Sequence, residues 1–299
     1  MTSIEVRKLH TLTGHRDGVY TVVAGDKPSE FFSGAGDGMV VMWNLEAPNE
    51  GELIAKLPNS IYALHRHKDI LIAGHNYDGI HLLDYRDRKE ISSLKTTDAA
   101  IFDIQSHNND LFIASGDGGF TVVDLERLVI KARHNLSQKS ARTIAVGGGD
   151  IAVGYSDNFI RIFDLDTYSL KKEWQAHTNS VFTLRYSPDG RFLLSGSRDA
   201  RLKAWDPAGD YSLRGEVVAH MYAINSLSFS PNGKHFVTCS LDKSIKLWDA
   251  DQLKLLKVID KARHAGHGTS VNKLLWTAFD GQVVSASDDR TISVWKFIF

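Results

Sequence analysis

Short runs of apolar residues alternate with polar positions along the whole chain, and turn residues separate the runs. The runs are four to eight residues long and rich in β-branched and aromatic residues, which is typical of β-strands. Tight turns are marked by Pro188-Asp189-Gly190 and Pro231-Asn232-Gly233. Only a stretch near residues 253–262 resembles a short helix. The pattern therefore predicts an all-β protein.

One arrangement of these strands recurs along the chain. An apolar strand is followed by a strand of small residues, an Asp, and a strand that ends near an aromatic residue. Four copies are clear, and in each the Trp stands six positions after the Asp. The four pairs are Asp37 and Trp43, Asp199 and Trp205, Asp242 and Trp248, and Asp289 and Trp295.

Three weaker copies lie between the first two clear ones, with Leu83, Val123 and Phe163 at the Trp position. The intervals between positions 43, 83, 123, 163, 205, 248 and 295 are 40, 40, 40, 42, 43 and 47 residues. Such an interval is typical of one four-stranded blade of a β-propeller. The sequence therefore predicts a single domain over residues 1–299, a seven-bladed β-propeller of four-stranded antiparallel blades.

The two ends of the chain are predicted to complete one blade together. The last copy ends at Phe299, directly after its third strand, and a surplus strand at roughly residues 4–12 precedes the first copy. Pairing these segments would remove exposed strand edges that otherwise promote aggregation. We therefore expect the ring to be closed by the amino-terminal strand pairing in the last blade.

The recurring residues resemble those of the WD40-repeat family of β-propellers. Gly14-His15 opens the first copy, and Trp205-Asp206 and Trp248-Asp249 close two later ones. In that family a His, a Ser or Thr, an Asp and a Trp form a buried hydrogen-bond network in a blade. The resemblance assigns this structural network to His15, Ser33, Asp37 and Trp43; His177, Ser195, Asp199 and Trp205; His220, Thr238, Asp242 and Trp248; and His267, Ser285, Asp289 and Trp295.

A recurring Ser, His and Asp could also indicate a hydrolase, because such a trio activates a hydroxyl nucleophile. One active site per protein is the norm, whereas four equivalent trios here follow the repeat. A buried Trp N–H needs a hydrogen-bond partner, which the polar trio can anchor. The pattern therefore favours a structural role, and no residue is predicted to be catalytic.

The second, third and fourth blades lack the complete set. Leu57, Thr97 and Ser137 stand at the position of the His, and no Trp follows. We expect mainly apolar packing in these three blades. Blades five, six, seven and one are then predicted to be the stiffer part of the ring.

Residues that differ between equivalent positions are candidates for recognition. The clearest such position follows the apolar anchor of each first strand, and the resemblance places it near the central opening of the top face, where many family members bind peptides. The predicted partner-binding residues there are Tyr20, Tyr62, Phe102, Arg142, Phe182, Asn225 and Asn272. Binding hot spots are rich in Tyr, Trp and Arg. Packing between blades is the alternative explanation for the aromatic residues.

A second variable position directly precedes the turn Asp, and the resemblance places it on the same face. Arg198 at this position, together with Arg142, would suit an acidic or phosphorylated peptide. A solvated turn residue is the alternative for Arg198. The copy that contains Tyr77 has one residue fewer between its Asp and the Trp position, so the place of Tyr77 is less regular. The members of this position are Gly36, Tyr77, Gly116, Ser156, Arg198, Leu241 and Asp288.

The composition argues against several other partners. The 35 Lys and Arg against 36 Asp and Glu give a net charge of -1, which favours neither nucleic acid nor an anionic membrane. The single Cys239 excludes an internal disulfide and a Cys-based zinc site, and fits the cytoplasm best. The sequence shows neither a signal-peptide pattern nor an apolar run of the roughly 20 residues that a membrane span needs.

Histidines and glycines that cluster in the sequence do not indicate a ligand site. A metal site needs three or four converging ligands, and His267 already belongs to a structural set, so these histidines are interpreted as a solvated face. They are His65, His67, His75, His81 and the pair His264 and His267. Glycine-rich stretches at 34–38 and 147–149 lack the features of a phosphate loop. We therefore predict no metal and no cofactor.

The sequence as a whole predicts a non-catalytic, cytoplasmic interaction scaffold, monomeric by itself, that binds a protein or peptide on the top face. Two alternatives stay open. The chain could be an obligate structural subunit of a larger complex. A propeller enzyme is the less favoured alternative, because converging catalytic groups cannot be assembled from the equivalent positions.

Overall fold

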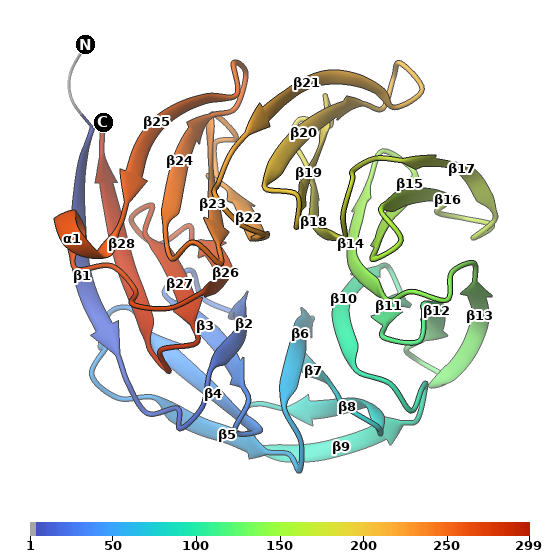
Figure 1. The fold of residues 1–299 in the computed structure, drawn as a ribbon. Helices are drawn as coiled ribbons and strands as arrows, with labels where there is room; N and C mark the ends of the chain where they lie inside the picture. The colour runs from blue at the N-terminus through green and yellow to red at the C-terminus, as the bar shows by residue number, and fades with distance from the viewer. Residues whose placement is uncertain (1–3) are drawn as a thin grey trace.

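The computed structural model describes residues 4–299 and consists of seven four-stranded antiparallel sheets. Figure 1 shows the sheets as blades around a central opening. In each of the first six blades, four strands consecutive in the chain lie side by side from the centre of the ring to its rim. The predicted all-β, seven-bladed propeller is confirmed.

The strands alternate in direction within each blade, and consecutive blades follow one another in the chain. The blades are β2 (Val19–Ala24), β3 (Glu30–Ala35), β4 (Met39–Asn44) and β5 (Glu52–Lys56); β6 (Ile61–His67), β7 (Ile70–His75), β8 (Gly79–Asp84) and β9 (Lys89–Leu94); β10 (Ile101–His107), β11 (Asp110–Ser115), β12 (Gly119–Asp124) and β13 (Val129–Asn135); β14 (Ala141–Gly147), β15 (Asp150–Tyr155), β16 (Phe159–Asp164) and β17 (Leu170–Gln175); β18 (Val181–Tyr186), β19 (Leu193–Ser197), β20 (Arg201–Asp206) and β21 (Ser212–Val218); β22 (Ile224–Phe229), β23 (His235–Ser240), β24 (Ile245–Asp249) and β25 (Lys254–Ile259); and β26 (Val271–Trp276), β27 (Val283–Ser287), β28 (Ile292–Ile298) and β1 (Glu5–Leu12).

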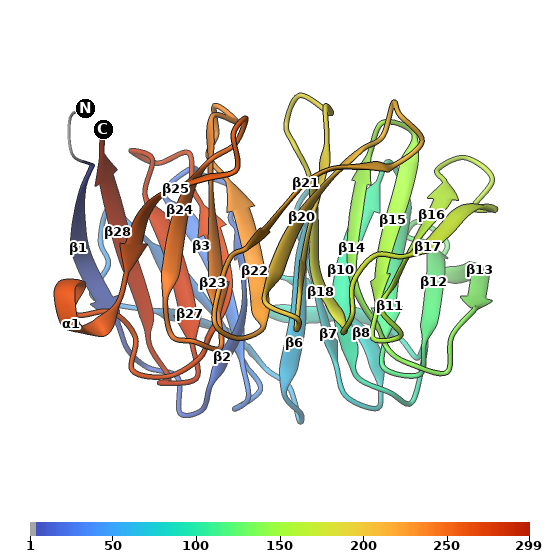
Figure 2. The ribbon, with the colours of Figure 1, turned by 45° about the horizontal axis from the view of Figure 1, so that its top comes forward.

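The amino-terminal strand closes the ring, as predicted. β1 pairs antiparallel with β28, with Glu5 opposite Ile298 at one end and Leu12 opposite Ile292 at the other. Figure 2 shows β1 and β28 side by side at the outside of the seventh blade. The first and last strands therefore share one sheet, and β28 has no free edge.

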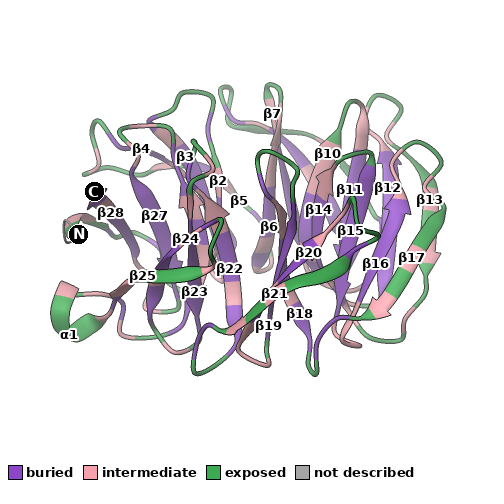
Figure 3. Cartoon of the chain, turned by 90° about the horizontal axis from the view of Figure 1, so that it is seen from above, coloured by how far each residue is buried: buried purple, intermediate pink, exposed green. Residues whose placement is uncertain are grey.

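The apolar core lies within and between the blades. Phe112 and Phe120 of blade three are fully buried, and the ring of Phe120 lies 4.6 Å from that of Phe163 in blade four. The outer strands alternate between exposed and half-buried residues, as the green and pink bands of β13, β17 and β21 show in Figure 3. Because both faces of the second and third strands are covered, these strands form continuous apolar runs in the sequence.

The helical stretch predicted near residues 253–262 is mostly a strand. Most of it forms β25, which pairs with β24 and buries Ile259 opposite Ile245. A helix, α1, spans only Lys261–His264, and its N-cap Asp260 accepts a hydrogen bond from the Arg263 amide. The prediction was wrong because sheet pairing outweighs local propensity. Within the described residues, no helix is long and apolar enough to cross a membrane.

Candidate functional site

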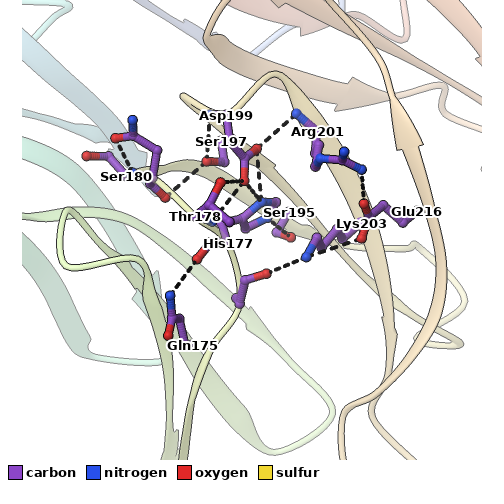
Figure 4. A network of polar contacts seen from close by, with 12 residues as sticks. Gln175, His177, Thr178, Ser180, Ser195, Ser197, Asp199, Arg201, Lys203 and Glu216 are labelled. Carbon is purple, nitrogen blue, oxygen red and sulfur yellow. Dashed lines mark hydrogen bonds and ion pairs between the residues drawn. The ribbon is translucent and has the colours of Figure 1, made fainter.

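Four blades contain the buried hydrogen-bond network that the repeated residues predict. In blade five, His177 Nε2 lies 2.8 Å from Ser195 Oγ, and the Trp205 indole N–H donates to the same oxygen over 2.8 Å. His177 Nδ1 lies 3.0 Å from Asp199 Oδ2. Figure 4 shows how His177 lies between Ser195 and Asp199. The set thus joins the loop before β18 to β19, β20 and the turn between them.

The same geometry recurs in blades one, six and seven. The hydroxyl oxygen of the Ser or Thr contacts both the His ring and the Trp N–H, and that Ser or Thr is fully buried in every set. The distances from this oxygen to His Nε2 and Trp Nε1 are 2.7 and 2.8 Å in His15–Ser33–Trp43, 2.8 and 2.9 Å in His220–Thr238–Trp248, and 2.8 and 2.8 Å in His267–Ser285–Trp295. A hydroxyl enclosed in this way has no open cleft in which to attack a substrate.

The carboxylates of the sets are held in their ionised form. Burial opposes the ionisation of Asp199, but the His177 ring and the amides of Thr178 and Arg201 outweigh it and hold the pKa of Asp199 well below its ordinary value. The pKa values of the other three carboxylates shift in the same direction for similar reasons. They belong to Asp37, Asp242 and Asp289.

Blades three and four contain polar networks that the prediction of mainly apolar packing missed. Thr97 stands at the position of the His and donates to Asp117 over 2.7 Å, and Arg133 of the outer strand donates to the same carboxylate over 2.6 Å. In blade four, Arg161 forms ion pairs with Asp157 at 2.9 Å and Glu173 at 2.8 Å. The missing sets are therefore partly replaced by charged contacts between neighbouring strands.

The histidine cluster is not a solvated face. His75 is fully buried, with Nε2 2.6 Å from Nε2 of His81, and His81 Nδ1 lies 2.8 Å from Glu90. His65 contacts Ser106 of blade three, and burial lowers the pKa of His65 to about 4. The interpretation failed because neighbouring strands and blades enclose these positions. Among residues 4–299, no group of three or more His, Cys, Asp or Glu side chains is placed to hold a metal ion.

We expect backbone amides in blades five, six, seven and one to exchange with solvent more slowly than those in blades two, three and four. The complete sets have buried hydroxyls, whereas the other networks end on partly exposed outer-strand residues, for which water competes. The outer-strand residues are Glu90, Arg133 and Glu173. Native-state hydrogen exchange measures this difference, and equal protection around the ring would contradict it.

The seven predicted partner-binding residues on the inner strands meet around one cavity. They are half-buried and line a space of about 260 Å³ at one end of the central channel. This end carries the turns between second and third strands, because Val181 at the start of β18 pairs with Ser197 at the end of β19. We call this end the top face and the cavity the mouth. Its lining is Tyr20, Tyr62, Phe102, Arg142, Phe182, Asn225 and Asn272.

Five of these side chains form a continuous row around the mouth. The rings of Tyr20 and Tyr62 are stacked with centroids 5.0 Å apart, and Tyr62 lies 5.8 Å from Phe102. The Arg142 guanidinium lies 4.1 Å from the centre of Phe102 and 4.9 Å from that of Phe182. The residues thus pack between blades and also border the cavity, and partner binding there stays a prediction.

The two asparagines are engaged in joining blades. Asn225 Nδ2 donates to Ser270 Oγ over 3.0 Å and to the carbonyl of Val271 over 2.9 Å. Asn272 Nδ2 donates to the carbonyl of Val19 over 3.0 Å and to Asp288 over 2.7 Å. The side-chain amides of both asparagines therefore already have hydrogen-bond partners within the ring.

The side chain of Arg142 at the mouth has an unsatisfied hydrogen-bond donor. Its Nε is buried without a hydrogen-bond partner, and among residues 4–299 no carboxylate oxygen lies within 4.0 Å of its guanidinium. Burial, and then the nearby Arg198, lower the pKa of Arg142. Even so, a guanidinium keeps its charge at neutral pH. A cation held between aromatic faces without a counter-ion is suited to a carboxylate or a phosphate.

Arg198 lies outside the cavity lining but on the same face. Its backbone N–H donates to Ser180 in the loop before β18 over 2.9 Å, and its side chain is exposed. Equivalent amides make the same bond in five other blades. In blade two the turn has the same length, and Tyr77 there adopts a positive φ of 79°. The five residues are Gly36, Gly116, Ser156, Leu241 and Asp288.

Asp17, near Tyr20 of the mouth, was not among the residues predicted from the sequence. Burial raises the pKa of Tyr20, and the charges of Asp17, Tyr62 and Asp288 raise it further. Asp17 stands two residues after the His of its set, a position that holds Asn179 in blade five and Tyr222 in blade six. This variable position is a third set of top-face residues that the alignment of copies could have revealed.

Comparisons with known proteins agree with the fold and with the four complete sets. The family profile described as "WD domain, G-beta repeat" matches residues 6–44, 168–206, 212–249 and 259–296, the four segments that contain the complete sets. The crystal structure of the WD40 beta propeller domain of Doa1 is similar with a TM-score of 0.86 and 18% sequence identity, over 97% of each chain.

Three curated relatives show the range of the similarity. Protein lethal(2)denticleless of Drosophila melanogaster is 27% identical over 67% of this chain and 28% of its own length. Striatin of Mus musculus is 25% identical over 69% of this chain and 30% of its own. Eukaryotic translation initiation factor 3 subunit I of Culex quinquefasciatus is 24% identical over 68% of this chain and 56% of its own length. The matched region thus spans less than a third of the first two proteins.

Proposed function

The chain belongs to the WD40-repeat family of β-propellers, and we propose that it is a non-catalytic scaffold that binds a protein or peptide at the mouth. Propellers of this family generally bind proteins. The single observation that carries the proposal is the convergence of the seven variable inner-strand residues on one cavity. In this proposal the variable residues at the mouth bind the partner, and the shared buried sets stabilise the ring.

The chemistry of the mouth favours an acidic or phosphorylated segment. The aromatic row offers rigid apolar surface, and Arg142 lacks a counter-ion among the described residues. Arg198 adds a second positive charge on the same face. A carboxylate or phosphate that reaches Arg142 would form charge-assisted hydrogen bonds in a partly desolvated place, where such bonds are strong.

Two observations support a non-catalytic role. In all four sets the shared hydroxyl is buried and already has two hydrogen-bond partners. The WD40 family is also generally non-catalytic. A cytoplasmic location and a monomeric state of the isolated chain stay predictions.

Changing Tyr62, Phe102 and Phe182 together to Ala is expected to abolish capture of the partner. The substitutions remove three of the four aromatic rings around the mouth, including the two faces that hold Arg142. Affinity capture from the native host followed by mass spectrometry measures the loss. A correctly folded variant that captures the same proteins as the wild type would reject the proposal.

Two further variants sharpen this test. Ile91→Ala, Leu170→Ala and Leu213→Ala together remove apolar surface from outer strands, where the side chains are exposed, and should leave capture unchanged. Arg142→Gln keeps most of the packing volume but removes the charge, so it should reduce capture of an acidic partner about tenfold or more while the fold is retained.

An obligate subunit of a larger complex is the second candidate. One relative is by its name a subunit of a translation initiation factor. The outer strands also present apolar side chains to solvent, namely Leu53, Ile91, Val129, Ile130, Leu170, Leu213, Val218 and Leu255. Size-exclusion chromatography of the native protein separates the candidates. A subunit elutes only in a large assembly, and the outer-strand variant then loses that assembly while the mouth variant keeps it.

A further inference from the structure

Charges of opposite sign flank the mouth on facing sides. Arg142 and Arg198 belong to blades four and five, whereas Asp17 and Asp288 belong to blades one and seven. One blade separates the two pairs in one direction around the ring and two blades separate them in the other. The pairs therefore lie across the cavity from each other.

The negative side is built into the contacts of blades seven and one. Asp288 accepts a hydrogen bond from Asn272, which lines the mouth. A Cβ at Gly18 would lie 3.0 Å from Asp288 Oδ1, so this carboxylate touches the loop that also carries Asp17. Burial, and then the charges that include both carboxylates, raise the pKa of Tyr20, whose side chain lines the cavity. Among residues 4–299, no Lys, Arg or His nitrogen lies within 4.0 Å of either carboxylate.

The positive side has matching features. Arg142 fills the space between Phe102 and Phe182, so an incoming cation cannot enter that space. Arg198 is exposed, and its side chain makes no ion pair with another described residue. Between the two charged sides run the rings of Tyr20 and Tyr62, whose faces can also attract a cation from the ligand.

We infer that the mouth binds an extended peptide in one direction, with an acidic side chain at Arg142 and Arg198 and a basic side chain at Asp17 and Asp288. This inference rests on the proposed function and specifies its ligand. A peptide in the opposite direction would bring like charges together, which complementary binding sites disfavour. The charges thus set the orientation, and the aromatic row supplies apolar contact.

A displayed library of random peptides of about ten residues, which span roughly 33 Å when extended, tests the inference on the full chain. Peptides retained by the wild type are expected to share an acidic and a basic residue in a constant order and spacing. In a synthetic copy, exchange of these two residues should weaken binding about tenfold. A copy with phosphoserine in place of the acidic residue compares a phosphate with a carboxylate at the same position.

Variants of the charged residues test which side of the mouth binds the acidic residue and which binds the basic residue. Peptides retained by Arg198→Gln should no longer need the acidic residue. Peptides retained by the double variant Asp17→Asn and Asp288→Asn should no longer need the basic residue. Arg127→Gln, an exposed Arg on a turn of the opposite face, is the matched control and should change neither.

The outcomes separate the two hypotheses. Retained peptides without a shared basic residue, or affinity unchanged by the exchange, would overturn the inference and leave the proposed function standing. If every peptide that the wild type retains is also retained by the Tyr62, Phe102 and Phe182 triple variant, or if the wild type retains none, the proposed function fails.

Discussion

Removal of residues 1–12 is expected to produce a chain that aggregates or melts at least about 10 °C below the full chain. β1 pairs with β28 along its whole length, and Leu12 is buried against blade one. The deletion would expose the edge of β28, where Lys8 now lies over the ring of Trp295. Thermal melting followed by circular dichroism, with light scattering for aggregation, measures the effect.

A peptide of residues 4–13 supplied to the truncated chain is the control. It should restore the melting temperature and solubility, because it offers the same backbone partners to β28. A scrambled peptide of the same composition should not. If the truncated chain is soluble and melts within about 2 °C of the full chain, β1 does not close the ring.

Replacing Asp199 by Ala is expected to lower the free energy of unfolding by about 3 kcal/mol. The carboxylate contacts the His177 ring and accepts hydrogen bonds from the amides of Thr178 and Arg201. Its loss leaves buried polar groups without partners. Urea denaturation at neutral pH measures the difference. Asp251→Ala is the control, because that carboxylate is exposed and its ion pair with Arg191 should contribute under about 1 kcal/mol.

The loss at Asp199 is expected to depend on pH. The pKa of Asp199 is lower in the folded chain than in the unfolded chain, so the unfolded chain binds more protons as the pH falls. The stability that this carboxylate contributes is therefore present above about pH 4 and is lost as the pH falls further. The difference between the wild type and Asp199→Asn should shrink below about pH 4. A difference that stays constant through acid pH would contradict an ionised, bonded Asp199.

The blade number and the ring closure could be predicted because their signals recur. The six-residue spacing from Asp37 to Trp43 repeats in phase, and copies that lack the Trp keep their apolar second and third strands. These strands are buried on both faces, so almost every position in them needs an apolar or small residue. Outer strands such as β25 are half exposed, and their sequences carried a weaker and partly misleading signal.

The networks of blades two to four could not be predicted because their partners follow no shared spacing. Arg161 pairs with Glu173 on the outer strand, whereas His75 meets His81 within a hairpin. Each contact depends on strand register, which local sequence does not specify. The family resemblance described the complete sets and had no equivalent for these substitutes.

The sequence predicted which residues line the mouth, but it did not predict the contacts between their side chains. The residue after each buried anchor lies in a β-bulge, as the register shift between Val19 and Thr21 shows for Tyr20, and it borders the cavity. The insertion of Arg142 between Phe102 and Phe182 joins residues about 40 positions apart on three blades. Such a contact depends on side-chain conformations within the assembled ring.

The division between shared structural residues and variable recognition residues is tested most directly in blade five, by measuring unfolding free energy and peptide affinity for two variants. Ser195→Ala removes the partner of His177 and Trp205 and should lower the free energy of unfolding by about 2 kcal/mol, while the folded variant keeps the wild-type Kd for a peptide retained by the mouth. Phe182→Ala should raise that Kd about tenfold or more with a smaller loss of stability. The reverse result, with binding lost in folded Ser195→Ala and unchanged in Phe182→Ala, would contradict this division.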